Sequence, residues 1–215
     1  MNDQTKKLTT LAMLCALAFI VVTVFRIPVV LFLKYDPKDV IIAIGGFIYG
    51  PMAAFIIALL VAFVEMLTIS GTGIWGMLMN IISSSAFACT AAYMYKRNRR
   101  MRGAVDGLVL GVVCMVAVMM LWNYIVVPFY MGTPREAVAA MLIPYFLPFN
   151  LLKGSLNAAI TMLLYKPIVQ TLRRSGLMPQ SQQKQTGSFS IGTFLVSLMI
   201  VISCILVMLI LKGII

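Results

Sequence analysis

The chain has 215 residues, of which 62% are hydrophobic and 11% are charged, and its formal net charge is +11. A water-soluble domain carries about 25% charged residues, so most of this surface must face lipid. The composition therefore predicts an integral membrane protein. The length suits one compact helical domain and leaves no room for a separate catalytic domain.

The positive charges lie just beyond the ends of apolar segments. They gather at Lys6 and Lys7, in the run 96–102, and at Arg173 and Arg174. Cytoplasmic loops of membrane proteins show this pattern because they retain Lys and Arg during insertion. A nucleic-acid-binding surface would instead collect its cations on one soluble face, so nucleic acid is excluded as a partner. The N-terminus is predicted to be cytoplasmic.

Seven apolar segments approach the length of about 20 residues that a membrane-spanning helix needs. They are 8–27, 38–50, 51–69, 75–95, 104–127, 146–171 and 190–211. The second is short, and Gly50-Pro51 predicts a tight turn between it and the third segment. We expect an all-α integral membrane fold in which the first six segments form one substrate-binding bundle over residues 1–175. A polar cytoplasmic linker (176–189) and an additional transmembrane helix (190–215) follow it.

Two loops contain residue patterns that start helices. Residues 36–39 (Asp-Pro-Lys-Asp) pair a capping aspartate with a proline at the first helical position. Residues 133–136 (Thr-Pro-Arg-Glu) form a capping box, which predicts a short helix over 134–143 before Pro144 and Pro148 break the chain. Helix capping is therefore favoured over ligand contact for the carboxylates of both loops.

The sixth segment contains the most informative polar residues. Polar groups inside a membrane segment are costly, and we treat them as functional candidates. Asn150, Lys153 and Asn157 lie on one helical stripe. Lys153 lies about two turns inside the helix, too deep for a lysine that reaches back to water. We therefore favour a ligand contact or an ion pair for it.

Three further segments each contribute a polar side chain. Asn123 and Asn80 are amides that need hydrogen-bond partners when buried. Glu65 in the third segment is a carboxylate that is costly unless it is paired or protonated. Lys153 is one possible partner for Glu65, and a ligand is the other. The charge pattern places loops 26–37 and 70–74 on the outward side, near these residues.

Small residues mark one face of the first segment. Ala12 and Ala16 are spaced by four residues, and small side chains on one face allow another helix to approach closely. This pair is our candidate for a partner interface.

Motifs of enzymes and metal sites are missing from the sequence. There is no histidine, and the four cysteines lack the spacing of a zinc site. We also find no phosphate-binding loop, nucleophile elbow or acidic pair. We predict that the chain is not an enzyme and has no cofactor and no metal site.

Three stretches resemble a known family. They are 34–40 (Lys-Tyr-Asp-Pro-Lys-Asp-Val), 45–51 (Gly-Gly-Phe-Ile-Tyr-Gly-Pro) and 149–154 (Phe-Asn-Leu-Leu-Lys-Gly). Together they resemble the substrate-binding S components of energy-coupling factor (ECF) vitamin transporters, and within that family the riboflavin-specific members. The resemblance covers about residues 5–175.

The resemblance implies a fold, a location and partners. It implies a six-helix bundle in the bacterial cell membrane that binds one vitamin near its outer face. The partners would be a membrane T subunit and two cytoplasmic ATPases, and ATP hydrolysis would drive the S component to topple in the bilayer. Ala12 and Ala16 resemble the surface presented to the T subunit. The segment 190–211 departs from the six-helix pattern.

The resemblance also suggests how the substrate is bound. Asn123, Asn150 and Lys153 resemble groups that read the flavin ring, and Trp75 offers a flat surface to it. The predicted substrate-binding set is Tyr35, Glu65, Gly73, Trp75, Asn80, Asn123, Asn150 and Lys153. Lysine would equally suit a carboxylate vitamin such as biotin or pantothenate. A stand-alone secondary transporter with a coupling ion at Glu65 is a further alternative.

Overall fold

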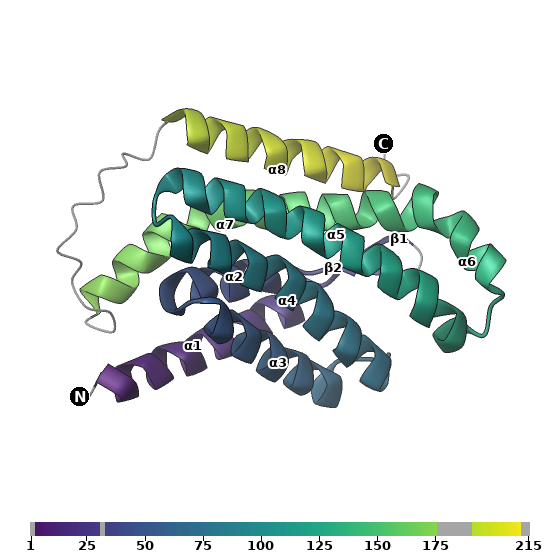
Figure 1. The fold of residues 1–215 in the computed structure, drawn as a ribbon, viewed down its shortest axis with the longest axis horizontal. Helices are drawn as coiled ribbons and strands as arrows, with labels where there is room; N and C mark the ends of the chain where they lie inside the picture. The colour runs from purple at the N-terminus through teal and green to yellow at the C-terminus, as the bar shows by residue number, and fades with distance from the viewer. Residues whose placement is uncertain (1–2, 31–32, 176–190, 212–215) are drawn as a thin grey trace.

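The computed structural model describes residues 3–30, 33–175 and 191–211. The elements are α1 (Asp3–Val24), β1 (Ile27–Val30), β2 (Leu33–Tyr35), α2 (Lys38–Tyr49), α3 (Pro51–Thr68), α4 (Gly73–Arg97), α5 (Met101–Met131), α6 (Arg135–Met141), the π-helical turn η1 (Leu142–Phe146), α7 (Leu147–Arg174) and α8 (Ile191–Leu211). Figure 1 shows a bundle with α8 along one side and α1 and α3 along the opposite side.

Each of the seven predicted segments contains a helix. Five helices of the described chain are long and apolar enough to cross a membrane, and they belong to α1, α3, α4, α5 and the continuous stretch from α6 to α7. The helix α2 has only 12 residues, whereas α8 extends over 21 residues from Ile191 to Leu211. The fold is thus a mostly helical membrane bundle, and the count of six spans plus one stays a prediction.

The predicted loop 26–37 contains a short two-stranded hairpin that the sequence did not predict. The helix α1 ends at Val24, and β1 and β2 then pair as an antiparallel hairpin with Ile27 opposite Tyr35. Pro28 cannot donate a helical hydrogen bond, and the β-branched residues around it favour an extended chain. The hairpin packs beside the helices rather than extending α1.

The predicted turn between α2 and α3 is confirmed. Gly50 has φ +95°, a left-handed conformation that a residue with a side chain rarely adopts, and Pro51 is the first residue of α3. This turn folds the short α2 back against α3.

The capping interpretation was wrong in both loops. The helices α2 and α6 begin without a side-chain cap hydrogen bond, with Pro37 and Pro134 at their N-caps. Thr133 Oγ1 is buried without a hydrogen-bond partner. The two aspartates of the first loop, Asp36 and Asp39, are buried in ion pairs instead.

The short helix predicted over 134–143 is present as α6, but the chain is not broken after it. The wider turn η1 carries the backbone past Pro144 into α7. A π-turn shifts the hydrogen-bond pattern by one residue, and proline has no N–H to donate. The region from α6 to α7 is therefore one continuous, locally widened helical path.

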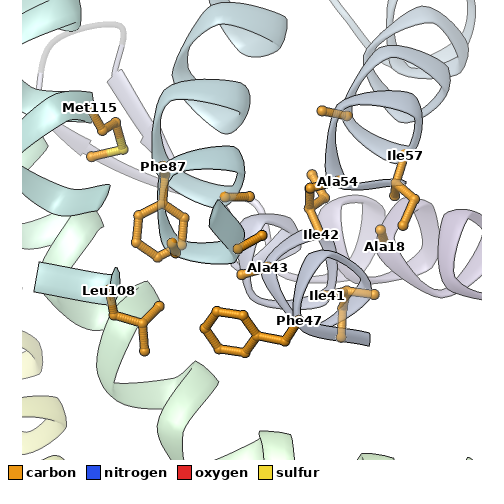
Figure 2. Packing of buried hydrophobic residues seen from close by; sticks show 14 of the residues in the cluster. Ala18, Ile41, Ile42, Ala43, Phe47, Ala54, Ile57, Phe87, Leu108 and Met115 are labelled. Atoms are coloured by element: carbon orange, nitrogen blue, oxygen red, sulfur yellow. The ribbon is translucent and has the colours of Figure 1, made fainter. Parts of the chain in front are cut away.

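Small residues bring the helices of the core close together. Figure 2 shows Phe47, Phe87, Ala43 and Ala54 among the residues of the main buried cluster. Gly46 of α2 lies where this helix approaches both α3 and α4 closely. A Cβ atom there would lie 2.8 Å from Ala92 Cβ and 2.9 Å from Ala54 Cβ.

We predict that Gly46→Ala destabilises the fold, whereas Gly71→Ala does not. The added methyl group at Gly46 would push α2 away from α3 and α4, an overpacking that costs about 1–3 kcal/mol. A Cβ atom at Gly71 meets nothing within 4 Å. Thermal unfolding in detergent measures both variants, and equal melting temperatures would contradict the close packing of α2.

Candidate functional site

A cavity of about 320 Å³ lies among the hairpin, α3, α4, α5 and α7. It uses the C-terminal half of α5 and the N-terminal part of α7, so it lies away from the basic connection between α4 and α5. Its lining residues are Arg26, Leu33, Lys34, Asp36, Glu65, Gly71, Thr72, Trp75, Gly76, Met79, Asn80, Ser83, Met119, Trp122, Asn123, Val126, Val127, Tyr130, Phe149, Asn150 and Lys153. The predicted outward loops 26–37 and 70–74 both contribute to it.

Six of the eight predicted substrate-binding residues line this cavity. They are Glu65, Trp75, Asn80, Asn123, Asn150 and Lys153. Tyr35 and Gly73 are not among the lining residues: Tyr35 is buried behind the wall, and Gly73 lies exposed at the start of α4 with φ +56°. The roles of all eight residues in binding remain predictions.

Lys153 lies between two aspartates. Its ammonium group is 3.3 Å from Asp36 Oδ2 and 3.6 Å from Asp39 Oδ2. Burial by itself raises the pKa of Asp36, but Lys153 and Lys38 together hold that pKa below its ordinary value. Asp36 is therefore ionised, and the charge of Lys153 is balanced within the protein.

A second lysine, Lys38, extends the network to Glu65. Its ammonium group donates to Glu65 Oε2 at 2.5 Å and lies 3.8 Å from Asp36 Oδ1. Arg26 reaches Glu65 Oε1 at 3.4 Å. The pair of Glu65 with Lys153 that the sequence left open is not among these ion pairs. Three basic and three acidic side chains give the network no formal net charge, which reduces the cost of burying them.

Neutral side chains complete the hydrogen bonding behind the network. Asn157 accepts a hydrogen bond from the Tyr35 hydroxyl at 2.9 Å, and its amide donates to Asp39 at 3.3 Å. The Ser84 hydroxyl donates to the other oxygen of Asp39. The amide of Asn150 donates to the carbonyl of Phe146 at 2.8 Å. Asn157 and Ser84 thus hold Asp39 in place, and Asn157 also holds Tyr35 of the hairpin.

Asn123 differs from the other two asparagines. Its side chain is 1% exposed, yet neither its amide nitrogen nor its carbonyl oxygen has a hydrogen-bond partner within the described structure. A buried amide left without partners is costly. Because Asn123 lines the cavity, a ligand that offers both an acceptor and a donor would satisfy it.

The remaining walls of the cavity are largely apolar and aromatic. Trp75 and Trp122 lie on neighbouring helices, and Met79, Met119 and Phe149 complete the lining between them. Aromatic faces and flexible methionines suit a flat ring system. The cavity thus combines apolar surfaces with a few polar groups, as small-molecule sites do.

Sequence reasoning missed Arg26 and Lys38 as members of the site. A signal was available, because both lie in or beside a loop predicted to face outward, where Lys and Arg are scarce. A Lys or Arg side chain in or beside an outward loop therefore indicates a specific ion-pair partner. Asn157 was noticed on the stripe of the sixth segment, but not its position behind the cavity wall.

Comparison with known proteins identifies the family of the chain. The family model described as "ECF transporter, substrate-specific component" matches residues 6–165. The chain is 29% identical to the riboflavin transporter RibU of Staphylococcus aureus, over 80% of this chain and 95% of that protein. It is 26% identical to the riboflavin transporter FmnP of Bacillus subtilis, over 78% and 96% of the two chains.

A solved structure shares the fold. The S component of a bacterial ECF transporter superposes with a TM-score of 0.68 at 30% identity, covering 80% of this chain and 99% of that one. The family model spans well over half of the chain. The chain therefore belongs to the substrate-specific components of ECF transporters.

Proposed function

We propose that the chain captures riboflavin in the cavity and delivers it to an energising module of the ECF type. Both named relatives are riboflavin transporters and align over nearly their whole length. The observation that carries the proposal is Asn123, a buried amide with an unpartnered donor and acceptor facing an aromatic cavity. The edge of the flavin ring presents acceptor and donor groups in a row, which suits this amide.

The charge balance of the site favours a neutral substrate. The alternative substrates biotin and pantothenate carry a carboxylate that could pair with Lys153. In the structure, however, Asp36 and Asp39 already neutralise it. A ligand carboxylate would enter beside Asp36 and Asp39 and be repelled by the ionised Asp36. Glu65 is likewise held by Arg26 and Lys38, so nothing about it favours a coupling-ion site.

We predict that the detergent-purified protein binds riboflavin tightly without ATP. The cavity is already formed in the isolated chain, so binding needs no energising subunit. Isothermal titration with riboflavin, biotin and pantothenate measures this directly. Binding of biotin or pantothenate in place of riboflavin would contradict the proposed substrate while leaving the family assignment intact.

We predict opposite effects on stability for two asparagine variants. Asn123→Leu removes a buried amide without partners, so the free energy of unfolding of the empty protein should rise, by about 1–3 kcal/mol. Asn157→Leu removes a satisfied amide and leaves Tyr35 and Asp39 short of partners, so it should lower stability. Thermal unfolding of the ligand-free proteins measures both.

The Asn123→Leu variant also tests riboflavin binding. Asn123→Leu should weaken riboflavin affinity by about tenfold or more, since the ligand loses at least one hydrogen bond in a buried site. A protein that becomes more stable while binding less well cannot owe its lost affinity to misfolding. Unchanged affinity of Asn123→Leu would place the flavin edge elsewhere in the cavity.

We further propose that α1 presents the partner surface, with the N-terminus in the cytoplasm of a bacterial cell. Ala12 and Ala16 are both exposed on α1, next to the exposed apolar side chains Met13 and Leu17. Small residues within an apolar face allow close helix approach in lipid. A membrane T subunit that works with two ATPases is the partner this surface suits.

We predict that Ala12→Leu or Ala16→Leu blocks riboflavin uptake by cells but leaves riboflavin binding intact. The added bulk prevents a helix of the T subunit from approaching α1, and the cavity is remote from this face. Ala117→Leu, an exposed alanine on α5, is the matched control and should take up riboflavin normally. Equal loss of uptake in all three variants would argue against α1 as the partner surface.

A further inference from the structure

The helix α8 lies outside the region shared with the family. The family model ends at residue 165, and the aligned regions take up nearly all of each relative but about four fifths of this chain. In the structure α8 packs along α7 and also contacts β1 (Figure 1). The role of α8 is therefore inferred from the elements that it contacts.

One face of α8 packs into a second buried cluster. Val201 and Cys204 lie partly buried against it, and Met208 belongs to it with 7% exposure. Its other members are Val29, Leu33, Tyr35, Val127, Val138, Phe146, Phe149, Leu152 and Leu156. The opposite face of α8 carries exposed apolar residues such as Met199, which is 68% exposed. The inner face of α8 therefore supports the hairpin and α7 together.

The supported hairpin forms one wall of the cavity. Leu33 and Lys34 of β2 line it directly. Tyr35 donates to Asn157, and Asp36, the residue after it, pairs with Lys153. A two-stranded hairpin is marginally stable by itself and needs packing against other elements. The packing on its outer side includes α8, while the cavity lies on its inner side.

We propose that α8 holds the β1–β2 hairpin against the cavity through Val201, Cys204 and Met208, and so slows the release of bound ligand. This inference rests on the proposed riboflavin site. In physical terms, ligand escape requires the hairpin wall to loosen, and each contact with α8 raises the cost of that motion. The three residues are positioning residues, because they touch the hairpin cluster and not the cavity.

Two methionines of the same helix give a matched test in the full-length protein. Met208→Ala removes a buried contact, and Met199→Ala removes an exposed one. Stopped-flow fluorescence of riboflavin should show dissociation about threefold or more faster for Met208→Ala, with the association rate little changed. Interaction energies between residues in contact typically correspond to factors of about two to more than a hundred in an equilibrium constant. Met199→Ala should match the unmodified protein. Equal dissociation rates for all three proteins would overturn the proposal.

A double variant tests whether the effect passes through the hairpin. Val29 of β1 is buried in the same cluster but does not line the cavity. If α8 acts through the hairpin, Met208→Ala should add little to the dissociation rate once Val29→Ala is present. If the double variant instead shows the product of the two single effects on the dissociation rate, α8 does not act through the hairpin.

Hydrogen exchange separates this inference from the proposed substrate. In the ligand-free protein, peptides containing β1 and β2 should exchange several-fold faster in Met208→Ala, while peptides of α3 and α4 keep their rates. Unchanged hairpin exchange, or faster exchange throughout the chain, would overturn the role of α8 whether or not riboflavin binds. Failure of the unmodified protein to bind riboflavin, with the hairpin effect present, would count against the substrate alone.

Discussion

The cavity depends on a network of three basic and three acidic side chains, five of which are buried. Arg26, Lys38 and Lys153 balance Asp36, Asp39 and Glu65, which are half of the acidic residues in the chain. Removing one member would leave an opposite charge uncompensated in an apolar surrounding, which is far more costly than the pair is favourable. The network therefore ties the hairpin, α2, α3 and α7 into one arrangement around the site.

This balance separates two kinds of polar group at the cavity. The charged groups form ion pairs with one another, Asn157 and Ser84 hydrogen-bond to Asp39 behind them, and together these groups act as a frame. The side-chain amide of Asn123, in contrast, has no hydrogen-bond partner within the described structure, and this is the feature that indicates a ligand. Apolar walls then supply most of the contact area, so recognition rests on a few hydrogen bonds placed against flat surfaces.

Much of the site was predictable because the cost of polar groups in lipid can be read directly from sequence. Asn123, Asn150 and Lys153 interrupt apolar segments, and all three line the cavity. Local motifs were less reliable. The Asp-Pro-Lys-Asp pattern indicated a helix cap, but both aspartates form ion pairs with Lys153, which is distant in sequence. Partners such as Lys38 and Glu65 are brought together by packing, which no local pattern encodes. The hairpin escaped prediction because its strands have only four and three residues.

The long sequence separation within the network has a consequence for how the protein is made. Asp36 and Lys153 are 117 residues apart, and Asp39 and Asn157 are 118 apart. During synthesis the two aspartates emerge long before the segment that holds their lysine and asparagine. The closure of so long a loop must precede any gain from the contact. The binding chamber is therefore completed only when α7 joins the bundle, and a nascent chain that stalls earlier has only the cations Arg26 and Lys38 to balance three carboxylates.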